Sequence, residues 1–128
     1  MLLVGSEDKK NKFTKKIKKK LKKLKLSDRV IFCGNISDMA TVYSISDIVL
    51  STSIEPEAFG RITAEACSMT KPVIATNHGG SREIIENNLS GWLVNPGDVE
   101  ALGEKIIHVL NLEQKKKIWL EVMQEKEL

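Results

Sequence analysis

Residues 51–66 read Ser51-Thr-Ser-Ile-Glu-Pro-Glu-Ala-Phe-Gly-Arg-Ile-Thr-Ala-Glu-Ala66 and join two different sequence patterns. The apolar run Asp47-Ile-Val-Leu-Ser51 leads into them, and a helical pattern begins at about Gly60. A short continuous apolar run is typical of a strand that is covered on both faces. The stretch therefore predicts a strand, a loop and a helix. Because glycine has no β-carbon, Gly60 lets a ligand approach the backbone at the junction.

The same alternation runs through the rest of the chain. Further strands are predicted at residues 2–5, 29–33, 71–76 and 91–94, and helices at residues 38–45, 60–69, 99–110 and 112–128. Strands interleaved with helices favour a parallel sheet with right-handed crossovers. The expected fold class is α/β, a Rossmann-like parallel sheet with helices on both faces. A chain of 128 residues fits one domain, here residues 1–128.

Three loops that follow predicted strands carry the informative residues. They are Gly34-Asn35-Ile36, residues 51–60 and Thr76-Asn-His-Gly-Gly-Ser-Arg-Glu83. Ligands of open α/β sheets bind outside the carboxyl ends of the strands, so all three loops should line one edge. In the third loop Gly79 and Gly80 are expected to serve tight loop geometry, and His78 is either a cleft residue or a solvated turn residue.

The helix start near Gly60 suits an anion, because unpaired N–H groups and a partial positive charge gather there. Glu57 lies just before it, and Glu65 follows eight residues later. Carboxylates accept hydrogen bonds from hydroxyl groups, so the pattern favours a diphosphate with a sugar and a ribose on either side. A loop cap at Glu57 and a surface glutamate at Glu65 remain an open alternative. The flanking alanines slightly favour a buried, paired Glu65.

Several blocks of the sequence match one enzyme family in order and spacing. Glu57, seven intervening residues and Glu65 form an EX7E motif, and the blocks at residues 51–61, 65–76, 78–83 and 90–97 surround it. From Leu3 to about Leu110 the chain resembles the donor-binding domain of retaining GT-B glycosyltransferases of family 4, the glycosyl transferases group 1. Thr70 stands where that family usually has glycine.

The resemblance implies a donor site. Glu57 would be the catalytic residue and contact hydroxyls of the transferred sugar, Gly60 would help to hold the distal phosphate, and Glu65 would bind the ribose. The implied donor-binding residues are Glu57, Ala58, Phe59, Gly60, Arg61, Glu65, Gly34, Asn35 and Ile36, with His78, Gly79 and Gly80 in a loop that faces the cleft. The family generally needs no metal, and the sequence has no Asp-x-Asp signature. We therefore expect no metal and no cofactor, with the nucleotide-diphosphate sugar as substrate.

Parts of the family pattern are missing from these 128 residues. Full-length members have an N-terminal acceptor domain, which is absent here. The first strand of the donor domain is also absent, with the Gly-Arg and Lys that neutralise the departing diphosphate, and such electrostatic stabilisation is often the largest catalytic term. That strand is central in a doubly wound sheet. The strands at residues 2–4 and 47–51 would thus lose the neighbour between them.

The expected function follows from both the matches and the gaps. It is a retaining glycosyltransferase that transfers a sugar from a nucleotide-diphosphate sugar to a glycan or lipid-linked acceptor, as in lipopolysaccharide or cell-envelope biosynthesis. Here it would be a truncated donor-binding domain that is inactive alone, with the acceptor domain on a separate chain or lost. The alternatives are a non-catalytic nucleotide-sugar binding module and the remnant of a split or decayed gene.

Eleven lysines and no acidic residue lie between Lys9 and Lys25. Phe13, Ile17, Leu21 and Leu24 form an apolar stripe within this run, which predicts a helix. The readings are a sheet-covering helix with a solvated cationic face, a contact with an anionic membrane surface, or nucleic-acid binding. The last is not expected, because aromatic residues and reading motifs are lacking.

No apolar run approaches the roughly 20 residues that span a bilayer. The two cysteines, Cys33 and Cys67, have no partner spacing and are expected to be buried thiols of a reducing compartment. We therefore expect a cytoplasmic protein, at most peripheral to the inner face of the membrane. Trp92 and Trp119 are expected to be core residues.

Overall fold

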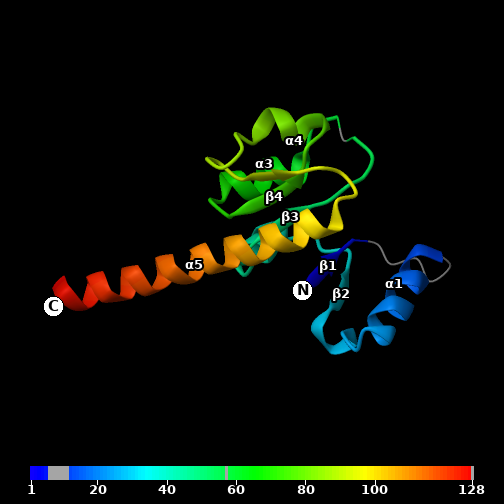
Figure 1. Cartoon of the computed structure of the whole chain (residues 1–128), viewed down its shortest axis with the longest axis horizontal. Coiled ribbons are helices and arrows are strands. Elements are labelled where there is room, and N and C mark those ends of the chain that lie inside the picture. Colours follow the sequence, from blue (N-terminus) through cyan, green and yellow to red (C-terminus); the bar gives the residue numbers. More distant parts are fainter. Residues whose placement is uncertain (6–11, 57, 128) are drawn as a thin grey trace. The chain divides into compact units, whose positions relative to one another are not determined.

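The computed structural model describes residues 1–5, 12–56 and 58–127 of the chain (Figure 1). Contacts divide the chain into two compact units, Met1–Met39 and Ala40–Leu128. Each unit has its own parallel sheet. The described elements alternate between strand and helix as predicted, and this confirms the α/β class.

The first unit contains one strand–helix–strand crossover. Its elements are β1 (Leu2–Val4), α1 (Lys12–Lys23), a 3-10 turn (Ser27–Arg29) and β2 (Ile31–Gly34). β1 and β2 are parallel, with Leu3 opposite Phe32. β2 begins two residues later than predicted, because Arg29 N–H closes the 3-10 turn on the Leu26 carbonyl at 2.9 Å.

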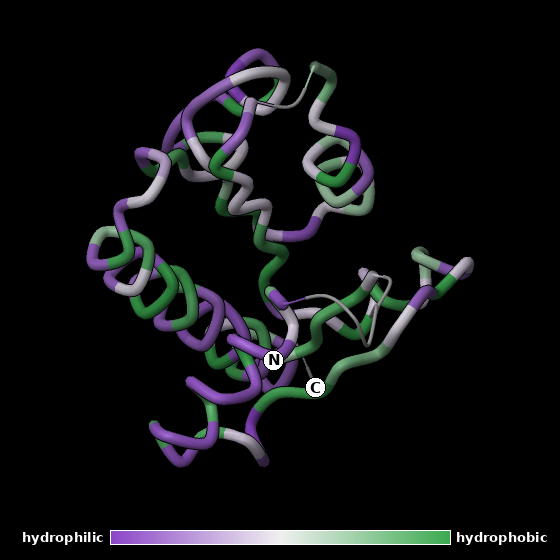
Figure 2. The backbone as a smooth tube through the Cα atoms, turned by 90° about the vertical axis from the view of Figure 1, so that its right-hand side faces the viewer, coloured by the Kyte–Doolittle hydropathy of each residue, from purple (hydrophilic) through white to green (hydrophobic). Residues whose placement is uncertain are grey.

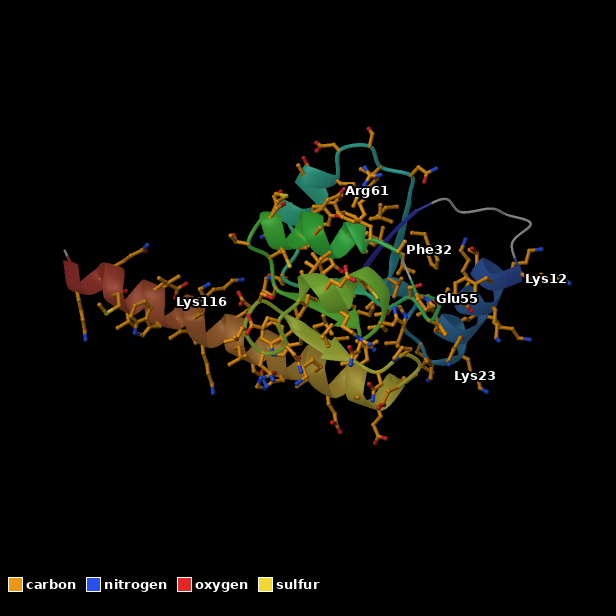
Figure 3. All side chains as sticks on the ribbon, turned by 90° about the horizontal axis from the view of Figure 1, so that it is seen from above. Lys12, Lys23, Phe32, Glu55, Arg61 and Lys116 are labelled. Carbon is orange, nitrogen blue, oxygen red and sulfur yellow. The ribbon has the colours of Figure 1, made fainter. Side chains whose placement is uncertain are left out.

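Helix α1 confirms the helix predicted for the lysine run. Ile17 and Leu21 are half-buried, whereas Phe13 and Leu24 are exposed, so only the middle of the apolar stripe is covered. Lys18 Nζ lies 5.0 Å from the centre of the Phe32 ring. Lys12 and Lys23, at the two ends of α1, extend outward in Figure 3.

The second unit holds the larger sheet. Its elements are α2 (Met39–Ser44, starting one residue later than predicted), β3 (Val49–Ser51), α3 (Arg61–Ser68), β4 (Val73–Thr76), α4 (Gly79–Ile84), β5 (Trp92–Val94) and α5 (Val99–Glu127). The strand order is β3-β4-β5, and both ladders are parallel. Figure 1 shows α3 and α4 on one side of this sheet and α5 along the other.

The core of the second unit lies between the sheet and α5. Ile74, Val94 and Val109 are its buried centre, and Trp92 and Leu102 are among the partly buried side chains packed on them. Complete burial of such an aliphatic side chain contributes about 1.5–3 kcal/mol. All four residues of the central strand β4 are buried, as expected for a strand with neighbours on both sides. The core role predicted for Trp92 is confirmed.

The prediction of a loop at residues 77–83 is wrong from Gly79 onward. Residues Gly79–Ile84 form α4, and Ser81 is buried within it. Two successive glycines are poor helix formers, so the local sequence indicated a turn. The packing of this segment on α3 overrides that preference.

The prediction of two C-terminal helices is also wrong, because α5 runs without interruption from Val99 to Glu127. No glycine or proline stands between Leu110 and Leu112, so nothing in the backbone chemistry ends the helix there. Trp119 lies in its distal half and is 60% exposed, which corrects the core role predicted for it. Cys33 and Cys67 are free but only half-buried, so the prediction of fully buried thiols is wrong too.

The two sheets are separate among the described residues. β1 pairs with β2, β3 pairs with β4, and no described ladder joins β1 to β3. Figure 2 shows hydrophilic residues at intervals along the helices. None of the described helices is long and apolar enough to cross a membrane.

Candidate functional site

Two of the three predicted loops meet at one edge of the second sheet. A β-carbon on Gly80 would overlap the carbonyl group of Phe59 and stand 2.6 Å from Gly60 N. A β-carbon on Gly60 would in turn stand 2.8 Å from Ser81 N. The start of α3 and the start of α4 are therefore in direct backbone contact, which only glycine permits. The tight geometry expected for Gly80 is confirmed, although it serves a helix contact rather than a turn.

A buried hydrogen bond joins the same two helices. The hydroxyl groups of Thr63 and Ser81 are 2.8 Å apart, and both residues are buried. Each hydroxyl gives the other the partner that a buried polar group requires. The bond joins α3 to α4.

His78 anchors the residues that follow β3. Its Nε2 lies 2.6 Å from the Ser53 carbonyl oxygen, and Thr76 Oγ1 donates to the same carbonyl at 2.8 Å. A carbonyl only accepts, so Nε2 donates in this hydrogen bond. Nδ1 is buried and has no partner among the described residues. The reading of His78 as a solvated turn residue is wrong, and its role in a cleft stays a prediction.

The start of α3 has no side-chain cap. Gly60 is the N-cap in the left-handed conformation (φ 69°), and no side chain caps the helix. The first N–H groups of a helix have no partner within it, and the helix dipole adds a partial positive charge. Phe59 is 70% exposed beside them, and Ala58 is exposed as well. Gly60 itself is buried, so the exposed side of this helix start is the loop residues before it.

Glu65 lies one turn further along α3 and is fixed by two donors. Tyr43 Oη donates to Oε2 at 2.8 Å, and Arg61 Nε donates to Oε1 at 2.9 Å. These hydrogen bonds, that of Tyr43 first, lower the pKa of Glu65 below its ordinary value. The side chain is 36% exposed. Glu65 is thus paired as predicted, but it is not buried.

Sequence reasoning missed Tyr43. This tyrosine is 3% exposed on α2, and burial, followed by the hydrogen bond to Glu65, raises its pKa to about 12. The phenol therefore stays protonated and remains a donor over the physiological range. No sequence motif surrounds it, and its partner lies 22 residues away in the chain. The only available signal was that a buried tyrosine hydroxyl needs a partner.

Comparison with known proteins identifies the family. The model of the family described as glycosyl transferases group 1 matches residues 1–125. The chain belongs to this family. One curated relative of this group 1 glycosyltransferase chain is the N-acetyl-alpha-D-glucosaminyl L-malate synthase of Bacillus anthracis, 34% identical over 94 residues, which are 73% of the chain and 24% of the relative. The chain thus spans about a quarter of that relative's length.

Solved structures of group 1 glycosyltransferases and related enzymes share the fold. A glycosyltransferase from Rickettsia africae superposes with a TM-score of 0.82 and 45% identity over 87% of this chain and 29% of that one. HepE from Anabaena, in complex with UDP-glucose, superposes with a TM-score of 0.83 and is 33% identical in sequence. The match covers 89% of this chain and 32% of HepE. The C-terminal domain of LpcC from Francisella tularensis superposes with a TM-score of 0.70 and is 31% identical in sequence. The match covers 77% of this chain and 52% of that domain's chain. The fold is that of GT-B C-terminal domains.

The remaining predicted site residues of this group 1 glycosyltransferase chain do not belong to the described contact between α3 and α4. Glu57, the predicted catalytic carboxylate, lies outside the described residues. Gly34, Asn35 and Ile36 follow β2 in the first unit, where Gly34 has a φ of 67° and its carbonyl accepts the Gly5 N–H at 2.9 Å. Within residues 1–5, 12–56 and 58–127, no three His, Cys, Asp or Glu side chains gather as metal ligands. The expectation of no metal and no cofactor stays a prediction.

Proposed function

We propose that these 128 residues form the sugar-and-ribose side of the donor site of a retaining GT-B glycosyltransferase. The observation that carries the proposal is that one helix has both an uncapped start at Gly60 and the fixed Glu65 carboxylate. The amides suit a diphosphate, whereas the carboxylate suits hydroxyl donors. A nucleoside-diphosphate sugar has both groups next to each other.

The relatives support the choice of ligand. HepE from Anabaena, 33% identical to this chain, is described in complexes with UDP, with UDP-glucose and with UDP and glucose. Curated relatives include a sucrose synthase and a capsular polysaccharide glycosyltransferase. We infer a nucleotide-diphosphate sugar as donor and a glycan or lipid-linked acceptor, as in cell-envelope or lipopolysaccharide synthesis.

The donor proposal is tested by calorimetry with UDP-, GDP- and ADP-sugars. We expect one of them to bind the 128-residue chain, and Glu65→Gln to weaken that binding by at least tenfold, since a hydrogen bond to a charged group contributes about 1.5–3 kcal/mol. Glu104→Gln is the matched control, because Glu104 is exposed on α5. Failure of the wild-type chain to bind any of the donors would overturn the proposal.

Catalysis by these residues alone is not part of the proposed function. Glu57 is the proposed catalytic carboxylate, but the Gly-Arg and Lys of the family pattern are not in this sequence. Their loss removes cations that stabilise the departing diphosphate, and such groups contribute several kcal/mol to catalysis. We therefore expect no sugar transfer and no donor hydrolysis with a labelled nucleotide sugar. Turnover at the rate of an ordinary glycosyltransferase would contradict this.

Two alternatives for the biological role differ in what they need. A split enzyme would recover transfer when a separate chain supplies the N-terminal Rossmann domain together with the Gly-Arg and Lys of the family pattern. A non-catalytic nucleotide-sugar binding module, or the remnant of a decayed gene, would not. An adjacent upstream reading frame that encodes such a domain would favour the split enzyme and supply the domain for the assay.

A second surface of the first unit suits an anionic membrane. The lysines of α1 are exposed together with the apolar side chains of Phe13, Leu24 and Leu26. Each lysine near an anionic lipid surface contributes about 1 kcal/mol to the free energy of membrane binding. We propose peripheral binding at the inner face of the membrane, in the cytoplasm, and no binding to nucleic acid. We expect the chain to sediment with anionic vesicles but not with neutral ones. Sedimentation that does not depend on the charge of the lipid would exclude this membrane binding.

A further inference from the structure

The Glu65 carboxylate is held by two donors of different character. Tyr43 is 3% exposed and comes from a different helix, α2, whereas Arg61 is one turn away on the same helix. The Arg61 side chain is 84% exposed, and exposed pairs four residues apart on a helix are weak. The buried phenol is therefore the donor that fixes the orientation of the carboxylate.

The phenol has little freedom to move. Its ring is enclosed, and its helix is tied to the end of α3 by a hydrogen bond from Lys71 Nζ to the Ser44 carbonyl at 3.0 Å. Tyr43 also contributes no charge of its own, since it stays protonated up to strongly basic pH. A neutral, immobile donor orients an anion and leaves its charge intact for a ligand.

We propose that Tyr43 is a positioning residue that orients Glu65 to accept both hydroxyl groups of the donor's ribose. Each carboxylate oxygen has about two lone-pair sites. Tyr43 uses one site on Oε2 and Arg61 uses one on Oε1, so within the part of the chain that the structure describes one site on each oxygen stays open. Two hydroxyl groups on neighbouring carbons match two oxygens of one carboxylate. This inference rests on the proposed nucleotide-sugar site and adds a selectivity for ribose over deoxyribose.

The orientation of the Glu65 carboxylate matters because a hydrogen bond weakens steeply when its donor–hydrogen–acceptor angle departs from a straight line. Without the phenol, the Glu65 side chain can rotate toward water, since more than a third of it is exposed. The loss should therefore fall on ligands that use both hydroxyl groups. A ligand without the 2′-hydroxyl has already lost one of these bonds and should be less sensitive to Tyr43.

The test compares a nucleoside diphosphate with its 2′-deoxy form on two variants. UDP, GDP and ADP are first screened on the wild-type chain, and the one that binds is used with its 2′-deoxy analogue. Tyr43→Phe removes the phenol oxygen and keeps the buried ring. Ser44→Ala is the matched control, because it removes a hydroxyl from the same helix that donates to the Thr41 carbonyl of that helix.

We expect Tyr43→Phe to weaken binding of the ribonucleotide about tenfold and to change binding of the 2′-deoxy form much less. Ser44→Ala should leave the ratio of the two affinities unchanged. In a Glu65→Gln background the effect of Tyr43→Phe on that ratio should disappear, since the positioned charge is gone. A general loss of fold would instead weaken both ligands equally.

Two different results overturn two different claims. An unchanged ratio in Tyr43→Phe, with wild-type binding intact, removes the positioning role and leaves the donor site standing. Absence of nucleotide binding by the wild-type chain removes the donor site and the positioning role with it. Equal weakening of both ligands by Tyr43→Phe also contradicts the inference, because it assigns Tyr43 a purely structural role.

Discussion

Gly80 packs so closely on Phe59 that a β-carbon at Gly80 would overlap the Phe59 carbonyl group. The obstacle is backbone, not the end of a flexible side chain, so neither partner can turn away. The contact ties the loop before α3 to the first turn of α4. Because that loop leads into the uncapped start of α3 at Gly60, this contact shapes the candidate donor site.

Replacement of Gly80 by alanine is therefore expected to destabilise the second unit by at least about 2 kcal/mol, since overpacking forces backbone shifts. Urea unfolding followed by tryptophan fluorescence measures the effect. Gly103→Ala is the control, because Gly103 lies in α5 and its β-carbon position has no described atom within 4 Å apart from its own chain neighbours and the helix backbone around it. There alanine should stabilise by about 0.5–1 kcal/mol. Equal effects at the two sites would contradict the close approach.

Thr70 has a left-handed backbone (φ 57°) directly after the C-cap of α3. This conformation strains a β-branched residue, and glycine is the usual residue at such a helix end. Thr70→Gly should raise the free energy of unfolding by about 1 kcal/mol. Asn88→Gly, at φ 68°, should gain less, because asparagine tolerates this region. A loss of stability in Thr70→Gly would refute the assignment of strain.

The buried pair of Thr63 and Ser81 should behave as a unit. Ser81→Ala leaves the Thr63 hydroxyl without a partner and should cost about 1–3 kcal/mol. Thr63→Val leaves the Ser81 hydroxyl in the same position. The double variant removes both groups and should cost less than the sum of the two single variants. Additive changes in urea unfolding would show that the hydroxyls do not interact.

The pH dependence of the Tyr43–Glu65 pair has opposite signs at its two ends. The folded pKa of Glu65 is lowered, so its contribution is present above the unfolded value and is lost as the pH falls through the folded value. The folded pKa of Tyr43 is raised to about 12, so its contribution is complete below about 10 and is lost as the pH rises toward 12.

Tyr43 is the single tyrosine of the chain, so its phenolate absorbance can be followed directly in a pH titration. Glu65→Gln should bring the midpoint down from about 12 toward 10, because the neighbouring negative charge is removed. The part of the rise in the Tyr43 pKa that remains in Glu65→Gln reports the burial of the phenol. Glu83→Gln, an exposed change elsewhere in the unit, should leave the midpoint in place. An unmoved midpoint in Glu65→Gln would show that the two side chains do not meet in solution.

The order of elements and the position of the helix start at Gly60 could be read from the sequence. Short apolar runs, the helical period and single glycines act over a few residues, so they identify β3, α3 and β4 without knowledge of the rest. The same local signals failed at Gly79 and Gly80, where two glycines indicated a turn but form the start of α4. There the contact with α3 outweighed the local preference.

The sequence by itself determined the α/β class and placed Glu65 on α3, because periodicity and residue type are properties of neighbouring residues. Only the tertiary structure decided what Glu65 touches. Its partner Tyr43 is 22 residues away, and the hydroxyl reaches the carboxylate because α2 and α3 pack in the same unit. The close approach of Gly80 to Phe59 has the same origin. Contacts between distant residues depend on how helices and strands pack, and no local pattern records that.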